Sequence, residues 1–183
     1  MSPMSPASPA SPLHPGTLLA TGLGVGYAKV APGTWGSLWG LPLAWGLATL
    51  PPWLGTLAWL ATLPVAYWAC GCGARHFQAH GQPGHDQGGI VVDEIAAVPL
   101  TLTPLVWAGW LPAFASGDWF VIAWASAIAF ALFRLLDIAK PGPIGWCDQR
   151  GDTLGVLLDD LAAGAIGGGV YAAGLMLWRA VSA

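Results

Sequence analysis

The stretch VVDEIAAVPLTLTPLVWAGWLPAF, residues 91–114, is apolar over nearly the length of a membrane span, yet it carries two adjacent carboxylates close to its start. A helix needs about 20 apolar residues to cross a bilayer. Ionised side chains inside hydrocarbon are costly, and they usually have a partner or a function. The stretch therefore predicts a membrane helix in which Asp93 and Glu94 belong to a functional site.

The composition is that of a polytopic membrane protein. Of the 183 residues, 55% are hydrophobic and only 8% are charged, whereas a soluble domain carries about 25% charged residues. The net charge of −3 gives no support to nucleic-acid binding. The three cysteines, Cys70, Cys72 and Cys147, lack zinc-ligand spacing and are interpreted as reduced structural thiols.

The predicted fold class is all-α, a polytopic helical membrane protein in one domain over residues 17–183. About five apolar helices are predicted, at residues 35–50, 53–73, 90–114, 119–139 and 154–181. The first is short and contains Pro42, so it either crosses the membrane or forms a re-entrant or interfacial helix. Residues 1–16 repeat Ser-Pro and are predicted to form a disordered tail. The glycine pairs Gly36/Gly40 and Gly164/Gly168 are interpreted as helix-packing faces.

Threading five spans through a bilayer places the loops 22–37, 74–89 and 140–153 on one side. That side would hold five of the six Lys and Arg residues, leaving only Arg179 on the other, so the positive-inside rule makes it cytoplasmic. The acidic residues near helix ends gather at the same side. The sequence thus predicts a polar site at the cytoplasmic face, built by Asp93, Glu94, Asp137, Asp159 and Asp160.

Two acidic pairs favour a divalent-cation site, because hard cations such as Mg²⁺ take oxygen ligands. Simpler interpretations stand beside this one. Asp93 and Glu94 would also cap a helix N-terminus, and Asp159 and Asp160 would also pair with Arg134 or Arg150. Lys140, just beyond a predicted helix, either complements the helix dipole, reaches the lipid headgroups or binds phosphate oxygens.

Two loops offer candidate substrate contacts. The segment APGTWGS, residues 31–37, supplies backbone donors and hydroxyls in front of a helix, where an anion binds well. Its candidate residues are Gly33, Thr34 and Ser37. In GHDQGG, residues 84–89, His85 either orients a ligand or is an ordinary loop residue.

Four motifs in order resemble the phosphatidylglycerophosphatase A family: GYAKVAPGTWGSLWGLPL (26–43), HDQGGIVVDEIAA (85–97), FALFRLLDIAKPGPIGWCD (130–148) and GVLLDDLAAG (155–164). The resemblance covers about residues 22–168. It implies an all-α, Mg²⁺-dependent lipid phosphatase of the bacterial inner membrane that converts phosphatidylglycerophosphate to phosphatidylglycerol and phosphate during phospholipid synthesis. Ala97 and Lys29 depart from the family pattern, and the charged set is intact.

Matching positions imply the following roles. The Mg²⁺ ligands are Asp93, Glu94, Asp159 and Asp160, with Asp137 as a further ligand or base. Lys140 and Arg134 spread the charge that develops on the phosphate, helped by the Thr34–Ser37 loop. A water activated by the cation is the hypothesised nucleophile.

Two other classes of function remain open at this stage. A cation or proton transporter would line its pathway with carboxylates spread through the depth of the membrane. A non-catalytic membrane assembly factor would tolerate neutralisation of both acidic pairs. The sequence sets neither the number of metal ions nor the oligomeric state.

Overall fold

The computed structural model describes residues 5, 8, 10–82, 84 and 87–182, and over these residues it contains helices and no strand. The helices are α1 (Pro15–Ala20), η1 (Val25–Tyr27), α2 (Pro32–Ala48), α3 (Pro52–Ala79), α4 (Val92–Ala97), α5 (Pro99–Trp107), η2 (Phe114–Ser116), α6 (Trp119–Ala139), α7 (Pro143–Asp148) and α8 (Thr153–Ser182). The all-α prediction is confirmed. The start of α1 lies within the segment predicted as a tail.

Proline positions determine where several helices begin. Helices α1, α2, α3, α5 and α7 each have a proline in the first turn, where the missing N–H removes no helical hydrogen bond and the fixed φ suits the helix. The predicted helix 90–114 is divided in this way, since α4 ends at Ala97 and α5 begins at Pro99. It also ends earlier than predicted, because Gly109 adopts a positive φ of 69° just after Trp107.

Within the described ranges, three helices, α3, α6 and α8, are long and apolar enough to cross a membrane. They contain the predicted segments 53–73, 119–139 and 154–181. In both α6 and α8, only 22% of an 18-residue apolar stretch is buried within the protein. The outward faces of these two helices therefore suit contact with lipid. Crossings by the other two predicted segments stay a prediction.

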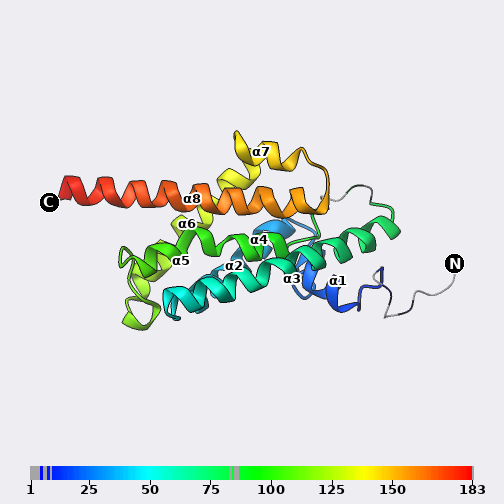
Figure 1. The fold of residues 1–183 in the computed structure, drawn as a ribbon, viewed down its shortest axis with the longest axis horizontal. Helices are drawn as coiled ribbons and strands as arrows, with labels where there is room; N and C mark the ends of the chain where they lie inside the picture. The colour runs from blue at the N-terminus through cyan, green and yellow to red at the C-terminus, as the bar shows by residue number, and fades with distance from the viewer. Residues whose placement is uncertain (1–4, 6–7, 9, 83, 85–86, 183) are drawn as a thin grey trace.

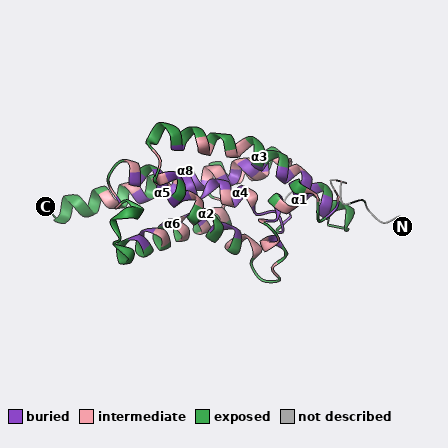
Figure 2. Ribbon diagram, turned by 90° about the horizontal axis from the view of Figure 1, so that it is seen from below, coloured by how far each residue is buried: buried purple, intermediate pink, exposed green. Residues whose placement is uncertain are grey.

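The long helices α3 and α8 lie along the long axis of the molecule and run in opposite directions (Figure 1). Helix α8 packs against α4, α5, α6 and α7, so it is the central contact partner of the elements that follow residue 91. Buried residues concentrate in α4 and the neighbouring half of α8, while the C-terminal end of α8 is exposed (Figure 2). The half of α8 that begins at Thr153 is therefore the half held in the bundle.

Glycines let α8 approach α4 and α5 at backbone contact distance. A Cβ atom at Gly164 would lie 2.5 Å from the carbonyl oxygen of Ala97, and one at Gly168 would lie 2.5 Å from that of Leu100. Gly36 and Gly40 of α2 pack closely on the side chains of Val91 and Val98. Both glycine pairs are confirmed as packing faces, and the short α4 is held between them.

We expect Gly164→Ala to destabilise the protein by about 1 to 3 kcal/mol, because the added methyl group collides with backbone that cannot move aside locally. The measurement is thermal unfolding of purified protein in detergent. Gly169→Ala is the matched control on the same helix, since a Cβ there meets nothing within 4 Å. Equal Tm values for the two variants would contradict the proposed packing.

Candidate active site

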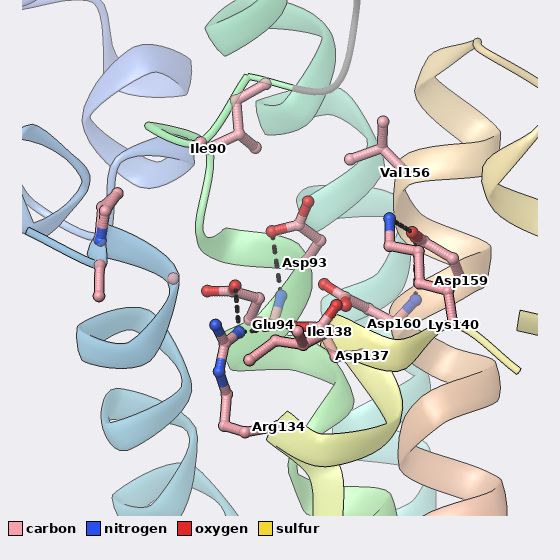
Figure 3. Close-up of a pocket in the computed structure, with 14 residues that line it drawn as sticks. Ile90, Asp93, Glu94, Arg134, Asp137, Ile138, Lys140, Val156, Asp159 and Asp160 are labelled. Atoms are coloured by element: carbon pink, nitrogen blue, oxygen red, sulfur yellow. Dashed lines mark hydrogen bonds and ion pairs between the residues drawn. The ribbon is translucent and has the colours of Figure 1, made fainter. Parts of the chain in front are cut away.

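A cavity of about 320 Å³ lies among the ends of α2, α4, α6 and α8 (Figure 3). Its lining contains every carboxylate and both cations that the sequence singled out for the site. The lining residues are Ala31, Pro32, Gly33, Gly88, Ile90, Asp93, Glu94, Arg134, Asp137, Ile138, Lys140, Val156, Asp159 and Asp160. The predicted convergence of acids that are distant in the sequence is thus present in the fold.

The first acidic pair lies in the first turn of α4, and both side chains are buried. Asp93 Oδ1 accepts a hydrogen bond from the backbone N–H of Glu94 at 3.0 Å, which is a helix-terminus interaction. The carboxylate of Glu94 instead extends toward α6. Helix capping therefore accounts for one oxygen of Asp93 and leaves Glu94 unexplained.

Glu94 forms an ion pair with Arg134, which lies one turn before the end of α6. Arg134 Nη1 donates to Glu94 Oε1 at 3.0 Å and to Asp137 Oδ2 at 2.5 Å. Two further atoms of this cluster, Glu94 Oε2 and Arg134 Nε, are buried and have no hydrogen-bond partner among the described residues. Because unpartnered buried polar atoms are costly, the cluster suits an additional polar ligand.

Lys140 is the second cation, and it ends α6 in the left-handed conformation with φ 44°. Its ammonium group forms ion pairs with Asp148 of α7 and with Asp159 Oδ2 of α8, the latter at 2.8 Å. Asp159 Oδ1 also accepts a hydrogen bond from the backbone N–H of Asp160 at 3.0 Å. An internal partner for the second acidic pair therefore exists, and it is Lys140.

Arg150, which was also predicted as a possible partner of the second acidic pair, lies outside the cavity. Arg150 Nη2 pairs with Asp152 Oδ2 at 3.1 Å, and neither residue lines the cavity. The hydrogen bond from Arg150 lowers the pKa of the Asp152 carboxyl group from its ordinary value. This exposed pair is separate from the buried network.

Asp160 is buried on the cavity wall, which also carries Asp93, Glu94 and Asp137. Among the described residues, five carboxyl groups and two basic side chains line the cavity, and an excess of buried negative charge is unfavourable without a compensating cation. All five carboxyl groups offer oxygen ligands of the kind that Mg²⁺ takes.

This donor set fits a magnesium ion in its chemistry. Over the described part of the chain, however, no three acidic, histidine or cysteine side chains form a ready-made metal cage. The ion pairs explain why, since Glu94 is directed at Arg134 and Asp159 at Lys140.

The predicted anion-binding segment, residues 31–37, lines the cavity with only some of its residues. Gly33 lines it, and a side chain at this position would collide with the carboxylate of Glu94. Thr34 and Ser37 are not lining residues, and the buried Ser37 hydroxyl donates to the carbonyl oxygen of Gly33 at 2.8 Å. His85 lies outside the described residues, while Gly88 of the same loop lines the cavity.

Two features of the site were missed by the sequence reasoning. Asp148 is eight residues from Lys140, and only the turn through Pro141 and Gly142 brings the two together. The apolar part of the lining, Ile90, Ile138 and Val156, has no sequence signal that separates it from other apolar residues.

The fold and the site combine helices that are long and apolar enough to cross a membrane with a cavity lined by acidic side chains, Arg134 and Lys140, an arrangement that suits a membrane phosphatase. The model of the phosphatidylglycerophosphatase A family matches residues 18–175. The chain belongs to this family.

Several named proteins are similar to the chain. The phosphatidylglycerophosphatase A of Escherichia coli is 35% identical over 159 residues, which cover 86% of this chain and 81% of that protein. That of Haemophilus influenzae is 35% identical over 152 residues, covering 82% and 83%. A Bacteroides thetaiotaomicron protein, provisionally named a phosphatidylinositol-3-phosphatase, is 34% identical over 152 residues, covering 80% and 85%. No solved structure matches the chain.

We expect Arg134→Leu to cost roughly 3 kcal/mol of stability, because it leaves the buried carboxylates of Glu94 and Asp137 without their cation. Arg150→Leu removes an exposed ion pair and should cost less than about 1 kcal/mol. Thermal unfolding of both variants in the same detergent measures the difference. A Tm for Arg134→Leu equal to that of Arg150→Leu would show that the buried network contributes nothing to stability.

Proposed function

We propose that this protein is a Mg²⁺-dependent phosphatase that hydrolyses phosphatidylglycerophosphate to phosphatidylglycerol and inorganic phosphate in bacterial phospholipid synthesis. In this proposal it works in the inner membrane with its site facing the cytoplasm. The observation that carries the proposal is the convergence of Asp93, Glu94, Asp159, Asp160 and the cation-bearing end of α6 on one cavity, in a chain of the phosphatidylglycerophosphatase A family.

The two cations suit the phosphate group of the substrate. Arg134 and Lys140 approach the cavity from the same helix end, and both are already held by carboxylates that fix their direction. In hydrolysis, water oxygen bonds to phosphorus, the bond from phosphorus to the headgroup oxygen breaks, and that oxygen gains a proton. Arg134 and Lys140 stabilise the charge that develops on the phosphate oxygens.

The remaining roles fall to carboxylates. Asp93, Glu94, Asp159 and Asp160 would hold Mg²⁺, which when bound supplies a Lewis acid for the phosphate oxygens. Asp137, held by Arg134 on the cavity wall, is the proposed acceptor of the proton lost by the attacking water.

The cavity also suits a substrate that stays in the membrane. Ile138 lines the cavity although 71% of its surface is exposed, and its α6 neighbour Leu135 is also exposed. The cavity therefore has an apolar edge on the outer side of the bundle. The headgroup can enter there while the acyl chains remain in hydrocarbon.

The two rival functions are less well supported. A transport pathway needs polar groups along its length, whereas the five lining carboxyl groups surround a single cavity. An assembly factor needs no such concentration of buried charge, which is costly to maintain.

Purified protein should release phosphate from phosphatidylglycerophosphate with added Mg²⁺ and lose this activity in EDTA. Asp93→Asn and Asp160→Asn should each lower kcat by about 100-fold or more, because each removes a charged cation ligand. Phosphate release in detergent micelles is the measurement.

Asp152→Asn is the control, since Asp152 lies outside the cavity, and it should keep full activity. Phosphatidylinositol 3-phosphate serves as the competing substrate, because one relative is named for it. Activity that survives both EDTA and the two cavity substitutions would refute the proposed site.

The proposed orientation is testable through native Cys147, which is partly exposed on α7 next to Asp148, whereas Cys70 and Cys72 are buried. A membrane-impermeant maleimide should label Cys147 in inverted membrane vesicles and leave it unlabelled in right-side-out vesicles. A Cys147→Ser, Ser116→Cys variant, with its thiol in exposed η2 at the other end of α6, should show the opposite pattern. Labelling of Cys147 in right-side-out vesicles would contradict the proposed orientation and show that the opposite one is correct.

A further inference from the structure

We infer that Asp148, on the short helix α7, is a positioning residue that holds Lys140 in its working direction. The inference rests on the proposed function and adds a residue to it. Asp148 forms an ion pair with the ammonium group of Lys140 but does not line the cavity. Any effect it has on substrate must therefore pass through Lys140.

The two carboxylates that hold Lys140 lie in different environments. The Asp159 side chain is 7% exposed, whereas that of Asp148 is 36% exposed, so the ammonium group is held between an inner and an outer partner. Figure 3 shows the hydrogen bond that Lys140 donates to Asp159 on the cavity wall. With one partner alone, a side chain with four rotatable bonds would keep much of its freedom.

The backbone between the two residues is shaped for this contact. Lys140 and Gly142 both have positive φ, 44° and 53°, so the chain reverses sharply after α6. A Cβ atom at Gly145 would lie 2.6 Å from the carbonyl oxygen of Lys140, so α7 folds back on the turn at a distance that only glycine permits.

Packing fixes α7 in that place. Ile144 is fully buried in a cluster with Phe133 of α6 and Ala163 of α8. Helix α7 is thus attached to both helices that carry the catalytic groups, and Asp148 follows one turn after the buried Ile144. The ion pair is therefore formed by an anchored element and a strained turn, which is what a positioning role requires.

The test uses the 183-residue chain, in which Lys29 and Lys140 are the two lysines. In Asp148→Asn we expect an amine-reactive acetylating reagent to modify Lys140 roughly threefold faster, because the side chain loses its outer carboxylate partner and gains freedom to meet the reagent. Exposed Lys29 is the internal control and should keep its rate. Peptide mass spectrometry reads both lysines in one sample.

The same variant should lower kcat for phosphatidylglycerophosphate by about 10-fold with KM changed less than about twofold. Asp148→Glu should restore most of the loss, and Asp152→Asn should change neither kcat nor the lysine rates. Unchanged labelling of Lys140 in Asp148→Asn would overturn the inference whatever the enzyme's substrate. Faster labelling with unchanged kcat would overturn the positioning role. Inactivity of the unaltered protein would refute the proposed function, and the labelling result would still decide whether Asp148 holds Lys140.

Discussion

The burial of negative charge at one end of an apolar bundle is the constraint on which the rest of the structure depends. In the part of the chain that the structure describes, five carboxyl groups line one cavity, and charged groups taken out of water are stable only when paired or bound to a cation. Arg134 and Lys140 each offset part of this negative charge by forming ion pairs with two carboxylates. The end of α6 must therefore meet α4, α7 and α8 at the same place.

Close helix packing makes that meeting geometrically possible. The glycines of α8 allow its backbone to touch α4 and α5, while Gly36 and Gly40 bring α2 against the other side of α4. The six residues of α4 would be too few for an independent helix, and tertiary contacts on both faces hold it. Packing and electrostatics are thus two requirements on the same short element.

Much of this could be predicted from the sequence because the signals were strong and local. Apolar length located α3, α6 and α8, and alternation of chain direction placed the acidic pairs at one end. One helix was predicted over residues 90–114, so the break at Pro99 was missed, since a proline in an apolar stretch is compatible with either a kink or a helix boundary. The roles of Thr34 and Ser37 at the cavity were also inferred from the loop motif, but the backbone directs the Ser37 hydroxyl to Gly33. Asp148 was not selected because its contact with Lys140 depends on a three-dimensional turn.

The apolar edge of the cavity at Ile138 has a consequence for how such an enzyme meets its substrate. In the proposed function the lipid reaches the cavity across this edge, so encounter is a two-dimensional diffusion problem, and the relevant concentration is the mole fraction of substrate among the surrounding lipids. Diluting the lipid with detergent at constant bulk concentration would then slow turnover. The proposed product, which keeps its acyl chains, would then re-enter the same leaflet without passing through water.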